Sequence, residues 1–280
     1  MKIGVIGAGV MGSGVAQRFA TYGHDVTLLD ISEQALEESK TTIRNNVRLA
    51  KMMKLGKQIA DMDAFWEHIH FEMNYDALKD CDVIIENVRE EIETKKGVYE
   101  QLEKVCKEDC IYLVNTSCIS ITKIGSYTNR PDKVVGTHFM NPVPLKKAAE
   151  VIKGYYTSEE TLTKLKDLLS NVEIHPIVVN DFPGFVSNRI SHLLMNEAAY
   201  VVQDGVATAK DVDDIFKMCF EHKMGPLETA DLIGLDTVVD SLDVLYESYH
   251  DPKFRVAPIL KKMVDAKLLG RKSGEGFYKY

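Results

Sequence analysis

Residues 1–16 read MKIGVIGAGVMGSGVA and contain the pattern that decides the fold. The apolar run Ile3 to Ile6 predicts a buried strand, and the residues that follow the glycines predict a helix. Between them stands Gly-x-Gly-x-x-Gly. The first glycine permits a tight turn, the second lets the backbone approach a pyrophosphate, and the third lets helix and strand pack closely. The pyrophosphate is expected at the positive end of the helix. This predicted phosphate-binding turn comprises Gly7, Gly9, Val10, Met11 and Gly12.

A second predicted strand, residues 25–29, ends in Asp30, eighteen residues after Gly12. A carboxylate at this place accepts hydrogen bonds from the ribose 2′-hydroxyl and repels a 2′-phosphate. No arginine follows in residues 31–33 to bind such a phosphate. The sequence therefore predicts NAD rather than NADP as the cofactor.

Composition and charge exclude several classes of protein. Of the 280 residues, 45% are hydrophobic and 27% charged, which is ordinary for a globular chain. The net charge of −8 argues against nucleic-acid binding. A strand that begins at residue 2 leaves no room for a signal peptide, and no apolar run is long enough to span a membrane. Five scattered cysteines predict reduced thiols and a cytoplasmic protein, and no ligand set for a metal ion is apparent.

Apolar runs typical of buried strands recur through the first 180 residues and alternate with helical patterns. This alternation predicts an α/β fold with a Rossmann-type, doubly wound parallel sheet. Ligands of such sheets bind at the carboxyl ends of the strands, where Asp30, residues 115–117 and His138 fall. The predicted strands cover residues 3–6, 25–29, 69–73, 82–87, 111–115, 134–139 and 174–179.

The strand pattern disappears after residues 181–184, whose sequence is DFPG. We therefore expect an NAD-binding domain at residues 1–182 and an all-helical C-terminal domain at residues 183–280. A small apolar helical domain commonly completes its core by pairing with a second copy, which predicts a homodimer through the C-terminal domain. The predicted helices cover residues 185–203, a stretch that opens with the capping box Thr208 to Asp211, a stretch that opens with Pro226, and residues 258–269.

A long helix is expected from Ser32 to about Gly56. Four cations recur on it at spacings of four, three and three, which places them on one stripe of an otherwise acidic protein. They are either a solvated helix face or a binding surface for a phosphorylated or acidic partner. This basic stripe comprises Arg44, Arg48, Lys51 and Lys54.

Several separated blocks resemble the L-3-hydroxyacyl-CoA dehydrogenases, including the bacterial 3-hydroxybutyryl-CoA type, over nearly the whole chain. The blocks are residues 115–117 (NTS), 138–144 (HFMNPVP), 150–152 (EVI), 183–189 (PGFVSNR), 224–227 (MGPL), 234–237 (GLDT) and 270–274 (GRKSG). The resemblance implies NAD-dependent oxidation of the 3-hydroxyl of an acyl-CoA.

Oxidation of a secondary alcohol requires a base for the hydroxyl proton, and imidazole suits this role because it titrates near neutral pH. His138 is the candidate base, with Glu150 as the carboxylate that holds its other ring nitrogen. The resemblance implies that Ser117 and Asn188 bind the oxygens of the substrate. It also implies that Glu90, Lys95, Ser117, Asn141 and Lys272 join the phosphate-binding turn and Asp30 around the cofactor. Arg48, Lys51 and Lys54 are the candidates for binding the substrate's carrier.

Some positions depart from the family pattern. Cys118 stands where many relatives have a second serine, and residues 144–150 read PLKKAAE where PVMKLVE is closer to the common pattern. Asn46 and Met53 stand near an expected serine and lysine that would contact coenzyme A. Residues 138–146 and 222–231 resemble a branch that acts on units bound to an acyl carrier protein, such as hydroxymalonyl or methoxymalonyl extenders.

Three alternatives therefore stay open. The first is a dehydrogenase of a carrier-protein-bound hydroxyacyl unit, such as glyceryl. The second is a protein that binds NAD without catalysis and has a structural or sensing role. The third is a 6-phosphogluconate-like hydroxyacid dehydrogenase, which needs a catalytic lysine where this chain has Asn188 and Arg189.

Overall fold

A computed structural model describes all 280 residues. The chain divides into two compact units, Met1–Asp181 and Phe182–Tyr280. The first contains every strand of the sheet, and the second is helical apart from two isolated bridges between short segments near the C-terminus. None of the helices combines the length and the apolar character needed to cross a lipid bilayer.

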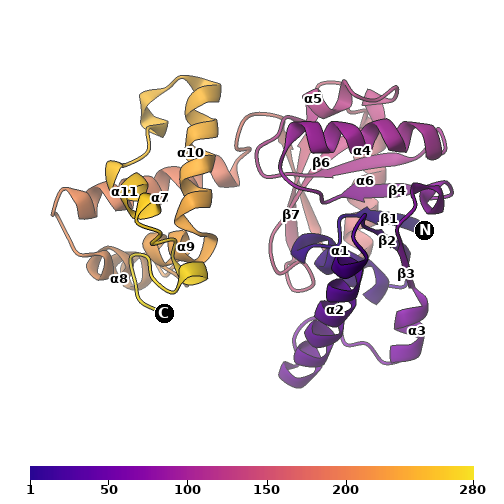
Figure 1. Cartoon of the computed structure of the whole chain (residues 1–280), viewed down its shortest axis with the longest axis horizontal. Helices are drawn as coiled ribbons and strands as arrows, with labels where there is room; N and C mark the ends of the chain where they lie inside the picture. The colour runs from indigo at the N-terminus through magenta and orange to yellow at the C-terminus, as the bar shows by residue number, and fades with distance from the viewer. The chain divides into compact units, whose positions relative to one another are not determined.

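The first unit is built on one eight-stranded sheet in the order β3-β2-β1-β4-β5-β6-β7-β8 (Figure 1). All neighbouring strands are parallel except β6 and β7, which are antiparallel. This sheet confirms the predicted Rossmann-type fold class. The strands are β1 (Lys2–Ile6), β2 (Asp25–Leu29), β3 (Ile69–Glu72), β4 (Val83–Glu86), β5 (Ile111–Asn115), β6 (Val134–Phe139), β7 (Ala148–Lys153) and β8 (His175–Asn180).

Helices cover both faces of the sheet, which explains why its central strands are apolar at most positions. On one face, Ile3 and Val5 of β1 belong to a core that also contains Val15 and Phe19 of α1. On the other face, Tyr112 of β5 packs against Tyr99 of α4, with ring centroids 5.7 Å apart. The helices of this unit are α1 (Val10–Thr21), α2 (Glu33–Met53), α3 (Met62–Glu67), α4 (Ile92–Val105), α5 (Ile121–Gly125) and α6 (Glu159–Asn171), with short 3-10 helices η1 (Tyr75–Leu78) and η2 (Pro131–Lys133).

Strand β7 is absent from the predicted strands, and it breaks the expected parallel order. Its central residues from Ala149 to Ile152 are buried, as in the other strands, although Glu150 is among them. The segment is short and Glu150 interrupts its apolar residues, so its pattern does not indicate a buried strand. The antiparallel pairing with β6 places Glu150 directly opposite His138.

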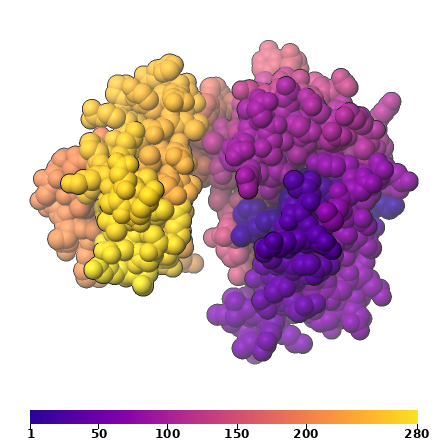
Figure 2. Space-filling model, in the orientation of Figure 1, coloured from indigo at the N-terminus to yellow at the C-terminus, as the bar shows by residue number.

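The second unit packs its helices around one core that includes Met195, Leu227, Val238 and Leu242. In Figure 2 its atoms, coloured orange to yellow, form a closely packed body. Its helices are α7 (Ser187–Gln203), α8 (Ala209–Cys219), α9 (Pro226–Ile233), α10 (Leu235–Tyr249) and α11 (Pro258–Asp265), with short 3-10 helices η3 (Pro252–Phe254) and η4 (Arg271–Ser273).

Two features of this unit differ from the expectation. The predicted helix 258–269 is too long, because α11 ends at Asp265 and Lys267 adopts a left-handed backbone with a φ of 62°. The helix α10 was not among the predicted elements. By contrast, α8 begins at its predicted cap, where the Thr208 hydroxyl accepts a hydrogen bond from the Asp211 amide.

Two buried carboxylates fix the end of the chain. Asp231 accepts hydrogen bonds from the amides of Phe277 and Tyr278, each 3.0 Å long. Asp213 accepts the Tyr278 hydroxyl at 2.7 Å and the Leu227 amide at the start of α9. The last residues are therefore an integral part of the helical unit.

Candidate active site

The turn between β1 and α1 leaves open space for a phosphate. Gly7 has a φ of +94°, and a Cβ on Gly12 would lie 1.7 Å from the Gly7 carbonyl oxygen, so neither position tolerates a side chain. A Cβ on Gly9 would meet nothing within 4 Å. No side chain caps the start of α1, where Gly9 is the N-cap and Val10 the first residue. The amides at this helix start therefore fit the pyrophosphate of a dinucleotide.

Asp30 lies beside this turn at the carboxyl end of β2. One carboxylate oxygen accepts the Ala8 amide at 2.7 Å, and the other accepts the Ser32 amide at 2.9 Å. The side chain therefore holds the glycine turn in place in addition to the ribose contact expected from the sequence. This contact with Ala8 was not anticipated, because it joins two segments that only the sheet brings together.

A cleft of about 760 Å³ opens over these residues, within the size range of small-molecule sites. Gly7, Gly9 and Asp30 line it together with residues that the sequence did not single out. Those additional residues come from the segments after β3 and β4 and from α4, and they include Tyr75, Asn87, Arg89, Thr94 and Val98.

His138, Glu150 and Ser117 form one hydrogen-bonded chain. His138 Nδ1 lies 2.8 Å from Glu150 Oε2, and both residues are more than nine-tenths buried. Ser117 Oγ lies 3.3 Å from the other ring nitrogen, Nε2. With Glu150 holding Nδ1, the ring turns Nε2 towards Ser117.

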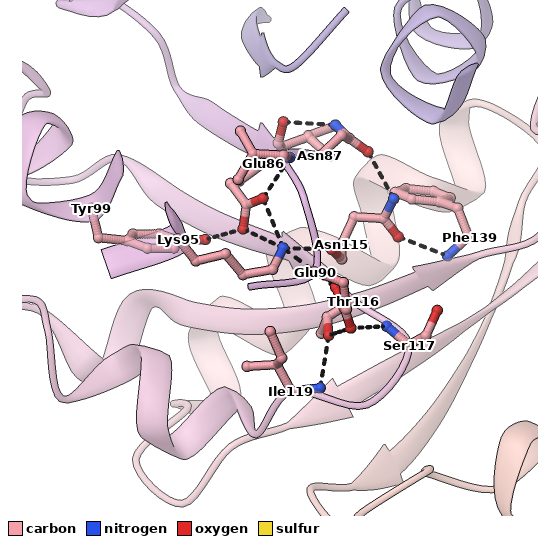
Figure 3. A network of polar contacts seen from close by, with 12 residues as sticks. Glu86, Asn87, Glu90, Lys95, Tyr99, Asn115, Thr116, Ser117, Ile119 and Phe139 are labelled. Carbon is pink, nitrogen blue, oxygen red and sulfur yellow. Dashed lines mark hydrogen bonds and ion pairs between the residues drawn. The ribbon is translucent and has the colours of Figure 1, made fainter. Parts of the chain in front are cut away.

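The Ser117 turn rests on a buried polar network (Figure 3). Lys95 Nζ donates to both oxygens of Glu86, at 2.8 and 2.9 Å, and to the Asn115 carbonyl at 3.0 Å. The Lys95 and Glu86 side chains are both fully buried, and burial raises the pKa of the Glu86 carboxyl while Lys95 opposes the shift. These contacts of Lys95 are all with protein groups, and the place at the cofactor that the resemblance implies stays a prediction.

Lys95→Met is expected to lower the free energy of unfolding by about 3–5 kcal/mol, because it leaves the Glu86 carboxylate buried without its counter-ion. The loss should grow with pH. Without Lys95 the pKa of folded Glu86 rises further above its unfolded value, so stability is kept below the unfolded pKa and is lost as the pH rises through the folded one. Urea unfolding at about pH 5 and about pH 8 measures this difference. Glu86→Gln combined with Lys95→Met should remove this pH dependence. An equal loss of unfolding free energy at both pH values in Lys95→Met alone would contradict the account.

Glu90 connects Lys95 to the backbone of the Ser117 turn. Its Oε1 accepts the Ser117 amide at 2.8 Å and the Cys118 amide at 3.1 Å, and its Oε2 lies 3.7 Å from Lys95 Nζ. Burial beside this carboxylate raises the pKa of the Cys118 thiol to about 12, so the thiol stays protonated at neutral pH and is a poor nucleophile.

Three other predicted site residues belong to other segments of the chain. Asn141 is exposed two residues after the end of β6, at a cis bond to Pro142. Asn188 and Lys272 belong to the second unit. There the Asn188 carbonyl oxygen lies 3.0 Å from His192 Nδ1, and Lys272 pairs with Asp236.

The basic stripe is exposed on α2. Arg44, Arg48 and Lys51 project from the helix, and Lys54 is its C-cap in a left-handed conformation. The Arg44 guanidinium lies 5.7 Å from the centre of the Trp66 ring. The stripe therefore offers positive charge to a partner in solution.

The profile of the 3-hydroxyacyl-CoA dehydrogenase NAD-binding domain matches residues 2–182, and that of the C-terminal domain of the same enzymes matches residues 184–280. The chain belongs to the 3-hydroxyacyl-CoA dehydrogenase family. Membership of this family makes it an NAD-dependent oxidoreductase, as the glycine turn and Asp30 predicted.

Individual relatives agree along their full length. The 3-hydroxybutyryl-CoA dehydrogenase of Clostridioides difficile is 44% identical, with 100% of this chain and 99% of the relative covered. The mitochondrial hydroxyacyl-coenzyme A dehydrogenase of Sus scrofa is 36% identical, with 99% and 90% covered. The crystal structure of (S)-3-hydroxybutyryl-CoA dehydrogenase from Ralstonia eutropha has a TM-score of 0.95 and 39% identity, with 100% and 98% covered.

Proposed function

We propose that this dehydrogenase oxidises the 3-hydroxyl of a 3-hydroxyacyl-CoA reversibly, with His138 as the base. The observation that carries the proposal is the Glu150–His138–Ser117 chain, with a distance of 2.8 Å on one side of the ring and 3.3 Å on the other. His138 Nε2 takes the proton of the substrate hydroxyl, and Glu150 stabilises the imidazolium that results. NAD, when bound, accepts the hydride from the same carbon.

Ser117 and Asn188 are proposed to hold the substrate. The Ser117 hydroxyl, beside His138 Nε2, suits a hydrogen bond to the oxygen on C3 and thereby orients this carbon. Asn188, in the first turn of α7, would add a second hydrogen bond to the substrate. We therefore assign substrate binding to both domains, residues 1–182 and 183–280.

Two groups of residues are proposed to bind the cofactor. The amides of the glycine turn would hold the pyrophosphate, which the open space at Gly9 supports, and Asp30 would hold the adenosine ribose. Ser117, Asn141 and Lys272 remain candidates through the family pattern. Glu90 and Lys95 are proposed to support the site by holding the turn that carries Ser117, since the Lys95 side chain is fully buried.

The names of the relatives support a short acyl-CoA as the substrate. The exposed cations Arg48, Lys51 and Lys54 would then bind the phosphates of coenzyme A. The same stripe would also suit the acidic surface of an acyl carrier protein. If it binds such a carrier, the protein is a dehydrogenase of a carrier-bound hydroxyacyl unit.

We also propose a homodimer that forms through the helical unit. This unit exposes large apolar side chains on and after α8, among them Ile215, Met218 and Phe220, and Met218 is 76% exposed. Light scattering of the purified protein gives the molar mass that tests this proposal.

A cytoplasmic location is proposed from the five cysteines without disulfide bonds and from the bacterial relatives.

Oxidation of 3-hydroxybutyryl-CoA with NAD, followed through the absorbance of NADH, tests the activity. We expect turnover in this direction and in reverse with acetoacetyl-CoA. Tight binding of NADH without turnover of any hydroxyacyl thioester would instead support a non-catalytic NAD-binding protein.

A further inference from the structure

The Thr116 hydroxyl is the centre of the turn that carries Ser117. Thr116 is 3% exposed, and its Oγ1 donates a hydrogen bond to Glu90 Oε1. The same oxygen accepts the Ile119 amide at 2.9 Å and the Cys118 amide at 3.3 Å. One hydroxyl thus joins the beginning of the turn to its end and to a carboxylate from another segment (Figure 3).

The start of this turn is also fixed from below. Lys95 Nζ holds the Asn115 carbonyl at 3.0 Å, and the Asn115 side chain bonds to Asn87 at 2.8 Å and to the Phe139 amide at 3.3 Å. Phe139 follows the base directly in β6. The turn is therefore anchored to the same strand that carries His138.

These contacts decide where the Ser117 hydroxyl lies. Ser117 has a single side-chain torsion to its Oγ, so the position of its backbone sets most of the 3.3 Å distance to His138 Nε2. The backbone is held by the bond from the Ser117 amide to Glu90, which shares its Oε1 with Thr116. A displacement of about 1 Å in a positioning group can cost about 10²-fold in rate.

We propose that Thr116 is a positioning residue of the reaction, which acts through Ser117 by locking the turn onto Glu90. This inference rests on the proposed function, in which Ser117 binds the substrate beside His138. Thr116 touches neither substrate nor cofactor in this account. Its hydroxyl, and not its methyl group, is the part that the reaction requires.

Thr116→Val keeps the shape of the side chain and removes the hydroxyl. We expect kcat to fall about 10- to 100-fold, because the turn loses its link to Glu90. The dissociation constant for NADH should change much less than kcat, because the glycine turn and Asp30 are untouched. Thr116→Ser, which restores the hydroxyl, should recover most of the turnover.

Thr161→Val is the matched control. Thr161 is equally buried, at 3% exposure, and its hydroxyl donates to the Asp132 carbonyl at 2.9 Å, away from the site. Both valine variants should lose thermal stability, whereas only Thr116→Val should lose kcat. If Thr116→Val does not fold, Thr116→Ala removes the same hydroxyl with less bulk and replaces it in the comparison.

A double-variant cycle with Ser117→Ala tests the route of the effect. If Thr116 acts through Ser117, Thr116→Val should change kcat of the Ser117→Ala enzyme by less than about twofold. An equal loss of kcat in both backgrounds, or wild-type turnover of Thr116→Val, would overturn the inference while leaving the proposed function intact. Wild-type turnover of Ser117→Ala would overturn both the role of Ser117 and the inference built on it.

Discussion

His138→Gln is expected to reduce kcat by about 10³-fold, because glutamine has no group that takes a proton near neutral pH. The substitution keeps a polar side chain at a position that is 8% exposed, so the strand pairing of β6 with β7 should survive. NADH binding should be unchanged, since the base lies apart from the glycine turn and Asp30. Steady-state kinetics and a fluorescence titration with NADH measure both quantities.

Glu150→Gln provides the comparison for this variant. It keeps a hydrogen-bond acceptor for His138 Nδ1 but removes the charge that stabilises the imidazolium, so a smaller loss of kcat is expected. If His138→Gln retained more than about a tenth of the wild-type kcat, His138 would not be the base.

Asp30→Ala should lower the preference for NAD over NADP by at least about tenfold, because the carboxylate no longer repels the 2′-phosphate. The variant also loses the acceptor of the Ala8 amide, so the affinity for NAD itself should fall. The ratio of kcat/KM for the two cofactors measures the preference.

Asp30→Asn separates the two roles of this side chain. An asparagine oxygen can still accept the Ala8 amide, so the glycine turn should stay in place while the charge is gone. The preference should therefore relax with a smaller loss of NAD affinity than in the alanine variant. An unchanged cofactor ratio in both variants would contradict the placement of Asp30 at the ribose.

Local patterns were sufficient to predict most of the first unit. Fully buried parallel strands are continuous apolar runs, and the glycine turn has steric demands that only glycine meets, as the 1.7 Å approach at Gly12 shows. The base and its carboxylate were also predicted, but their contact depends on the antiparallel pairing of β6 with β7. That pairing joins distant residues and leaves no local signal.

The polar network beneath Ser117 was not predicted from the sequence. Glu90 and Lys95 have the appearance of ordinary charges near a helix start, and the family pattern implied a place at the cofactor. The structure gives Lys95 a fully buried side chain bonded to Glu86, and it joins Glu90 to the amides of the Ser117 turn. Such contacts depend on how α4 and the segments after β4 and β5 meet at the carboxyl ends of these strands, and no spacing along the chain encodes them.

The most direct test of the central claim compares two carriers of one acyl group. NADH oxidation is measured with acetoacetyl-CoA and, under the same conditions, with the acetoacetyl group loaded on an acyl carrier protein. The account predicts fast turnover of the CoA ester, with the exposed cations of α2 as its phosphate site. Turnover of the carrier-bound substrate alone would contradict it and would make the same stripe a docking surface for a protein.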